Sequence, residues 1–341
     1  MDLTLIVPGL AACIAHARGG DDALARFARY AGPVRVEREG LVRATGAALG
    51  LADPGASAPL RALGAGLDPA DDYVLAADPV SLVAGRADVR LEGAIDDLDA
   101  ADAAALVTAL DAHFADDGLA FAAPRPGAWF ARMRRTPALE TTPVDAVAGR
   151  PIIGALPRGA EGGTWQRWQN EIQMLLFTHP VNAAREARGL RPVSGVWFWG
   201  GGRAGTRAET GGDALALGSP DRVGDLLLGF ARRGGQAGAD TPAAFAGLEA
   251  RLAGSSAARA VVGVPAIGAD DGGLPAFAGA WADPAARALE RGALHSLSLV
   301  GDGTGVVVRW TAGRPSAFAR LAGVARRRPR LSVPPGADPD A

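Results

Sequence analysis

The sequence predicts an α/β protein with a mostly parallel sheet flanked by helices and a β-hairpin near its carboxyl end. Short apolar runs, typical of buried strands, alternate with segments in which apolar residues recur at helical spacing. Two alternating runs at 294–300 and 306–311 flank Gly301-Asp302-Gly303, which indicates a hairpin. Strands separated by helices favour a sheet that is covered on both faces.

In the first half of the chain, residues 3–7 give the clearest strand, because this apolar run stops at Pro8-Gly9. Residues 52–59, rich in Ala, Gly and Pro, indicate a loop, and Asp78-Pro79 a turn. The helix expected at 99–114 has one apolar stripe. The further strands expected here are 33–38, 72–76, 89–95, 119–122 and 129–133, and the further helix is 21–30.

The second half is more regular. A helix at 165–178 is followed by a helix at 180–188 that Gly189 ends, and then by a buried strand at 193–199. Further helices are expected at 220–232, 242–252, 275–291 and 316–326, and further strands at 213–217 and 260–264.

The chain length of 341 residues suggests about two domains, at roughly 150 residues each. Pro and Gly recur in 136–163, which makes this segment the expected connection between them. We therefore expect an α/β part at 1–150 and a second one at 151–330, packed on the same sheet or as a second lobe. The Pro-rich tail at 331–341 is expected to be disordered.

Composition excludes several kinds of chemistry. All 35 basic residues are arginine, so Schiff-base lysines, a P-loop lysine and lysine general bases are excluded. Cys13 is the only cysteine, which excludes an internal disulfide and cysteine-ligated zinc or iron–sulfur clusters. The four histidines are too few for a His-rich metal site, so no metal and no cofactor is predicted.

Charge and hydropathy bear on location and partners. The net charge of −2 gives no general attraction to nucleic acid or to anionic membranes. Asp2 is the only charge before the apolar residues 3–14, which does not suit a signal peptide, and no run of about 18 apolar residues suggests a membrane span. A cytoplasmic location is expected. The arginine-rich run 326–330 lacks interleaved aromatics, so nucleic acid is an unlikely partner.

The densest group of polar and aromatic residues lies between 165 and 202. Its candidate ligand-binding residues are Trp165, Asn170, Glu171, Gln173, His179, Asn182, Arg185, Trp199, Gly200, Gly201 and Gly202. Such amides, charged groups and tryptophans can line a pocket. The alternative is that the aromatics belong to the core while the polar groups cap helices and fix loops.

Two further features carry alternatives. The apolar strand expected at 193–199 runs into the three glycines at 200–202, and such a strand can end at the sheet edge where ligands bind. The glycine run matches neither common phosphate-binding motif and is equally typical of a tight turn. Asp78 follows an apolar run and is either a ligand-edge carboxylate or a turn residue. We expect 200–202 and the helices over 170–185 to form opposite walls of one site, which would bind a small anionic ligand or a protein partner.

Three segments also resemble a known family. ADPVSL at 77–82, HFADDGLAF at 113–121 and the block from Asn170 to Gly202 are similar to bacterial "regulation of pathogenicity factors" E-type proteins. That family is described as related to cofactor-independent phosphoglycerate mutase. The resemblance implies an alkaline-phosphatase-like core and phosphosugar isomerisation.

The resemblance also implies two divalent metals held by Asp and His, and a Ser or Thr nucleophile. The first ligand would be an Asp in a D-G turn after the first strand, where this chain has Pro8-Gly9, and none of the four histidines follows an aspartate. We therefore expect a related protein that lacks the two-metal site and acts in ligand binding or regulation. The alternatives are an active metal-dependent phosphomutase or phosphatase with an unusual site, and an accessory factor for a nucleic-acid enzyme.

Overall fold

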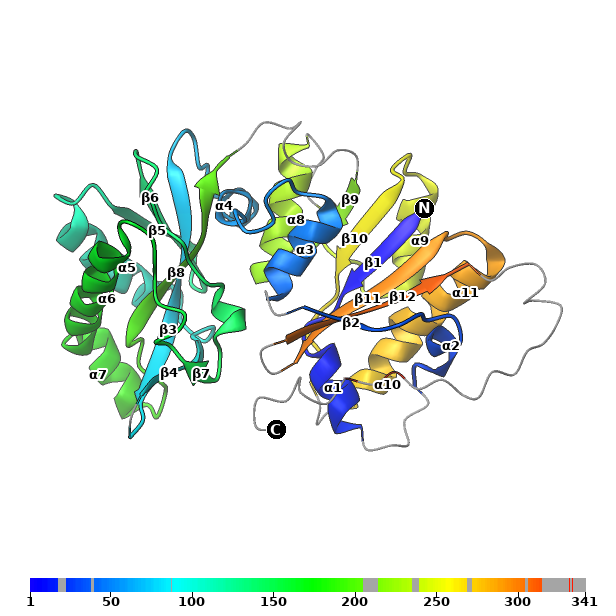
Figure 1. Ribbon diagram of the computed structural model, residues 1–341, viewed down its shortest axis with the longest axis horizontal. Coiled ribbons are helices and arrows are strands. Elements are labelled where there is room, and N and C mark those ends of the chain that lie inside the picture. Colours follow the sequence, from blue (N-terminus) through cyan, green and yellow to red (C-terminus); the bar gives the residue numbers. More distant parts are fainter. Residues whose placement is uncertain are drawn as a thin grey trace.

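The computed structural model describes residues 1–17, 23–37, 40–86, 88–204, 214–234, 239–268, 272–303 and 306–314, together with 331 and 333. These residues form two sheets, with helices α3 (Leu41–Leu49), α4 (Ala58–Ala65) and α8 (Arg222–Arg233) lying between them (Figure 1). The helix expected at 316–326 lies outside the described residues, as does nearly all of the tail expected at 331–341.

The first sheet has the strand order β2-β12-β11-β1-β10-β9. Its strands are β1 (Asp2–Ile6), β2 (Arg35–Glu37), β9 (Ala214–Leu217), β10 (Arg259–Gly263), β11 (Ser296–Gly303) and β12 (Val306–Gly313). Strands β9, β10, β1 and β11 pair in parallel, and β12 returns antiparallel to β11. The predicted α/β class and the predicted carboxyl-terminal hairpin are confirmed.

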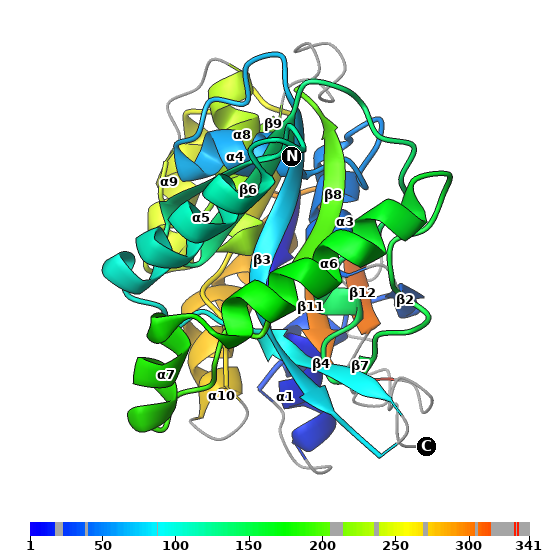
Figure 2. The same ribbon diagram turned by 90° about the vertical axis from the view of Figure 1, so that its left-hand side faces the viewer.

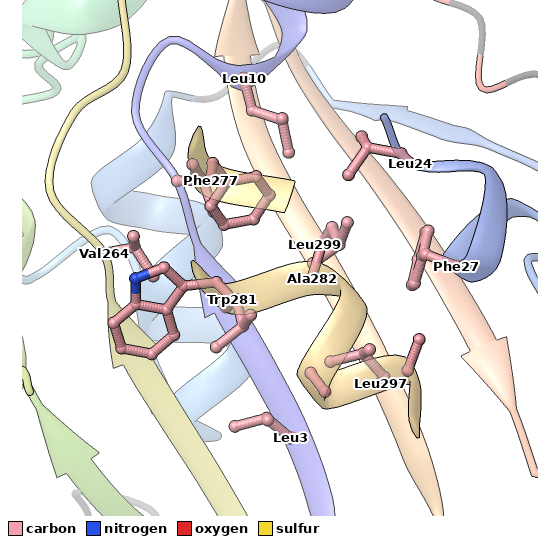
Figure 3. Close-up of a cluster of buried hydrophobic side chains, with 14 of the residues drawn as sticks. Leu3, Leu10, Leu24, Phe27, Val264, Phe277, Trp281, Ala282, Leu297 and Leu299 are labelled. Atoms are coloured by element: carbon pink, nitrogen blue, oxygen red, sulfur yellow. The ribbon is translucent and has the colours of Figure 1, made fainter. Parts of the chain in front are cut away.

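Both faces of the first sheet are buried. On one face, Leu3, Leu297 and Leu299 pack against Phe277 and Trp281 (Figure 3). The helical elements on this side are α1 (Leu10–His16), α2 (Ala25–Ala28), α9 (Phe245–Ala253), α10 (Gly273–Phe277), the π-helical turn η2 (Ala278–Ala282) and α11 (Asp283–Arg291). Side chains on the other face of the sheet pack in one cluster with α3, α4 and α8.

The second sheet is entirely antiparallel. Its strands are β3 (Tyr73–Ala84), β4 (Val89–Ala94), β5 (Ala120–Arg125), β6 (Ala128–Met133), β7 (Arg150–Pro151) and β8 (Gly195–Arg203), in the order β5-β6-β3-β4-β7, with β8 also paired to β3. The expectation of mostly parallel strands therefore holds for the first sheet only. Short connections such as those of β3–β4 and β5–β6 permit only antiparallel pairing.

Helices cover the outer face of the second sheet. Figure 2 shows α5 (Ala100–Phe114) and α6 (Gly162–Phe177) in front of it, with α7 (Pro180–Ala187) following α6. The inner face packs against α4 and the short 3-10 turn η1 (Val144–Ala146). Within the described part of the chain, we find no helix with the length and apolarity that a membrane crossing requires.

Two expected turns are parts of strands. Asp78 and Pro79 lie inside β3, opposite Trp197 and Val196 of β8. Pro79 has no backbone N–H to donate to a neighbouring strand. Its carbonyl still accepts a hydrogen bond from the Ile95 N–H at 2.8 Å. The segment Gly301–Gly303 belongs to β11, because its pairing with β12 continues to Gly303 opposite Val306.

Strand pairing crosses the boundary that was expected near residue 150. The first sheet combines β1 and β2 with β9–β12, and the second combines β3–β6 with β7 and β8. Each sheet therefore draws on both sides of residue 150. The division of the chain into units at 1–150 and 151–330 stays a prediction.

Candidate functional site

Most of the expected site residues on α6 serve packing or face the solvent. Trp165 is buried, with its ring centroid 5.0 Å from those of both Trp168 and Phe198. Asn170 is exposed and Gln173 is partly buried. Glu171 lies 3.5 Å from His113 and 3.7 Å from Arg167, in half-exposed ion pairs.

The expected residues around α7 hold the chain together locally. His179 is the N-cap of α7, where its Nδ1 accepts from the Val181 N–H. The buried Asn182 amide donates to the Val193 carbonyl and accepts from the Val193 N–H, both at 2.8 Å. Arg185 is buried and donates to the Asp97 carboxylate at 2.6 Å. These hydrogen bonds match the alternative in which polar groups cap helices and fix loops.

The three glycines at the end of β8 permit close packing. Gly200 has a φ of +68°, which favours glycine. A Cβ at Gly201 would overlap the Tyr73 side chain, and one at Gly202 would lie 2.9 Å from Ala56 Cβ. Because these glycines have no side chains, the loop before α4 and strand β3 can approach β8 closely.

These two groups of residues contact opposite ends of β8. Asn182 holds Val193, which precedes β8, whereas the glycines end β8. The six steps from Gly195 to Gly201 span at most about 20 Å, at about 3.3 Å each. The expectation that the glycines and the 170–185 helices form opposite walls of one site stays a prediction. Ligand binding by the individual residues stays a prediction.

Asp78 and Trp199 do meet, on the inner face of the second sheet. Trp199 Nε1 donates to Asp78 Oδ2 at 2.6 Å, and neither residue is exposed. Arg61 of α4, also fully buried, has Nη2 3.5 Å from Asp78 Oδ1. Its guanidinium carbon lies 4.7 Å from the Trp199 ring centroid and 5.7 Å from that of Phe130, so cation–π attraction supports the ion pair.

Charges of alternating sign extend from this pair in both directions. On one side, Arg222 Nε lies 3.5 Å from Asp78 Oδ2, and its Nη2 donates to the exposed Asp96 at 2.7 Å. The Asp78 and Asp96 carboxylates raise the Arg222 pKa although burial opposes this. On the other side, Arg125 is bonded to both carboxylate oxygens of Asp225.

Asp225, the partner of Arg125, also has a shifted pKa. Burial raises the pKa of Asp225 to about 6, against the opposing charges of Arg125 and Arg61. The chain of charges thus links β3 and β5 of the second sheet with α4 and α8, two of the helices between the sheets. It stabilises one arrangement of these elements, since removal of one partner would leave a buried charge unpaired.

A second group of carboxylates lies where parallel strands end. Strands β1 and β11 pair in parallel, so their carboxyl ends meet at one edge of the first sheet, the usual ligand edge of α/β proteins. Asp302 Oδ1 accepts the Gly9 N–H at 2.6 Å there. Asp145 Oδ2 accepts the N–H groups of Leu41 at 2.6 Å and Val42 at 3.4 Å, at the start of α3. Burial raises the pKa of both carboxyls.

The carboxylates at this edge are engaged with backbone N–H groups. Pro8 ends the first strand, and Asp302 and Asp145 already accept backbone N–H groups. His113 and His179 lie on helices outside the second sheet, and the His295 N–H donates to the Met1 carbonyl at the opposite end of β1. Nowhere in the described ranges do three or more His, Cys, Asp or Glu side chains form a group that could hold a metal ion.

Most residues of the charged network around Asp78 and of the carboxylate group at the sheet edge were not predicted from the sequence. The residues that it did not single out as site residues are Arg61, Asp96, Arg125, Asp145, Arg222, Asp225 and Asp302. One signal was available for Arg61, because it is the one charge in the otherwise apolar segment 58–65. The others carry no local signal, since their partners are distant in the sequence.

Comparison with known proteins gives one significant curated relative. Over 113 residues, a third of the chain, the sequence is 31% identical to 2,3-bisphosphoglycerate-independent phosphoglycerate mutase of Methanothrix thermoacetophila. A distant relationship to cofactor-independent phosphoglycerate mutase is shown. The match spans 29% of the length of that mutase. No family model matches the chain.

Two solved structures are similar over most of their length. The cofactor-independent phosphoglycerate mutase of Thermoplasma acidophilum matches with a TM-score of 0.40 and 15% identity, over 96% of each chain. The PH0037 protein of Pyrococcus horikoshii matches with a TM-score of 0.43 and 16% identity, over 92% of this chain and 87% of that one.

Proposed function

We propose that this chain is a relative of phosphoglycerate mutase that has lost the two-metal centre and binds a small anionic ligand in a regulatory role. The finer assignment to the "regulation of pathogenicity factors" E-type proteins, with an alkaline-phosphatase-like core, is part of this proposal. The observation that carries it is the use of Asp302 and Asp145 as acceptors for the N–H groups of Gly9 and Leu41, beside a first strand that ends in Pro8.

Arg222 is the cation best placed to take the ligand. Its side chain is 25% exposed, and its partner Asp96 is 67% exposed. Because the Asp96 side chain is exposed, this ion pair contributes only on the order of 1 kcal/mol, so an external anion can replace the Asp96 carboxylate on the guanidinium. The Asp78 carboxylate on the other side of Arg222 keeps the guanidinium in place.

Thermal unfolding with added inorganic phosphate or 3-phosphoglycerate tests this binding. We expect either anion to raise the Tm of the protein, by an amount that follows RT ln(1 + [L]/Kd). Asp96→Asn should enlarge the shift, because it removes the competing carboxylate, and Arg222→Gln should abolish it. Asp116→Asn, at an exposed position on a loop, is the matched control. Equal shifts in all four proteins would contradict the assignment to Arg222.

The alternative is an active metal-dependent phosphomutase, favoured by the 31% identity to a mutase over 113 residues. Elemental analysis after purification without chelator, together with an assay of 2- and 3-phosphoglycerate interconversion with added Mn²⁺, separates the two functions. We expect neither a stoichiometric metal pair nor turnover. About two equivalents of bound metal with mutase turnover would replace our proposal by this alternative. The arginine-rich run behind the nucleic-acid alternative lies outside the described residues.

A further inference from the structure

A hydrogen-bonded contact joins η1, which packs on the second sheet, to the start of α3, which packs on the first sheet. Asp145 lies in η1, which packs against β4 and β8 of the second sheet. Its carboxylate accepts the N–H groups of Leu41 and Val42, 104 and 103 residues away in the sequence. The N-cap of α3 is Gly40, which has no side chain to cap the helix. The helix therefore takes its capping carboxylate from a distant segment.

Gly40 is required for this approach in two ways. Its φ of +82° is a backbone conformation that favours glycine. A Cβ at this position would also overlap the Asp145 carboxylate. The second oxygen, Oδ1, is buried and has no hydrogen-bond partner among the described residues, so the carboxyl is held by one oxygen only.

We propose that Asp145 is a proton-sensitive latch. It holds the segment 144–149, which packs on the second sheet, against α3, and it does so more firmly when it takes up a proton. The latch has an open form, in which the Asp145 carboxyl leaves α3 and reaches water. Both partners of the contact then lose order, the first turn of α3 on one side and η1 on the other.

The direction of the pH effect follows from the groups around the carboxyl. Burial and the charge of Asp302 raise its pKa in the closed form, while the two N–H bonds and Arg222 oppose this. The charged residues of the packed strands face other partners: Arg90 pairs with Asp88, Glu92 with Ser81 and Arg191, and Arg203 with Thr136. In the open form the carboxyl has its ordinary pKa. The closed form therefore binds the proton more tightly, and rising pH weakens the latch.

Hydrogen exchange of individual amides tests the latch in the full-length protein. The readout is the protection of Leu41 and Val42 on one side, and of Val147 and Ala148, whose N–H groups donate to the Val144 carbonyl, on the other. In the wild type, protection at both places should fall together as the pH rises from about 4 to 8. The Asp102 amide, which is capped by Asp99 at the start of its own helix, is the control.

Two variants complete the test. Asp145→Asn keeps an accepting oxygen without a titrating proton, so protection at both places should fall less with rising pH than in the wild type. Asp145→Ala should lower protection at both places by about fivefold or more at every pH, as loss of a capping group does. If Asp145→Ala does not fold, the comparison of wild type with Asp145→Asn decides alone. Protection that is pH-independent in the wild type, that rises with pH, or that changes only in α3 would overturn the latch.

Discussion

Arg61 and Asp78 form the most deeply buried ion pair in the described part of the chain, since both side chains have no exposed surface. None of the guanidinium nitrogens of Arg61 has a hydrogen-bond partner among these residues. The pair therefore depends on charge and on stacking against Trp199. Arg61→Met should lower the free energy of unfolding by roughly 3–5 kcal/mol, because it leaves the Asp78 carboxylate buried with less compensation.

Chemical denaturation measures this loss. The double variant Arg61→Met/Asp78→Asn should be less destabilised than the sum of the two single variants, because the second change removes the uncompensated charge. Arg167→Met, in a half-exposed i,i+4 pair with Glu171, is the matched control and should change stability by less than about 1 kcal/mol. Additive losses would show that Arg61 and Asp78 do not act as a pair.

At the scale of residues, the sequence identified two of the residues that the structure joins, Asp78 and Trp199. It did not identify Arg61, which lies 17 positions before Asp78, because spacing in the chain does not show which buried charges meet across an interface. Asn182 and Arg185 attracted attention as polar residues near tryptophans, yet their hydrogen bonds fix the backbone at 191–193. Polar residues that bind a ligand and those that hold a loop have the same composition, so only geometry separates them.

At the scale of elements, α4 and α8 touch backbone to backbone. A Cβ at Gly64 would overlap the Asp225 carbonyl, and one at Gly229 would overlap the Leu60 carbonyl. Gly64→Ala and Gly229→Ala should each force the helices apart and cost about 1–3 kcal/mol or more, measured by chemical denaturation. Gly163→Ala is the matched control, because nothing lies near its Cβ position in α6, and alanine there should stabilise the helix slightly. Equal effects at the three positions would refute the close contact.

The helix with one apolar stripe at 99–114 was predicted well, whereas the buried helix α4 was not. The expected helix at 99–114 corresponds to Ala100–Phe114, with Asp99 as its N-cap. In contrast, 52–59 was expected as a loop, whereas α4 begins at Ala58. Helix α4 lies between the two sheets and packs against α8, β3 and β8, so it shows no polar face that would reveal its period. The close contact with α8 requires Gly64, which lies outside the segment expected as a loop.

At the scale of the whole molecule, the partition of strands between two sheets was out of reach. Strand β1 pairs with β10 and β11, more than 250 positions later, as in Asp2 opposite Arg259 and Ser296. The sequence carries apolar runs for these strands but no mark of which run pairs with which. The resemblance in the 170–202 block pointed to a relationship with phosphoglycerate mutase. The 31% identity over 113 residues supports this relationship as a distant one. The local residues alone would not have suggested it.

The charged network between the sheets should also make the stability of the whole molecule depend on pH. Asp225 is 2% exposed, and burial raises its pKa from the ordinary 3.8 to about 6, so the folded state binds its proton more tightly than the unfolded state. The stability that this gives is fully present below about pH 4 and is lost as the pH rises through about 6, a change of about 3 kcal/mol. The free energy of unfolding of the wild type, compared with that of Asp225→Asn, should therefore fall across this range. The difference between wild type and Asp116→Asn, an exposed acid, should stay constant. A wild type that instead gains stability over Asp225→Asn from pH 4 to 6 would show that Arg125 keeps the Asp225 carboxylate ionised throughout.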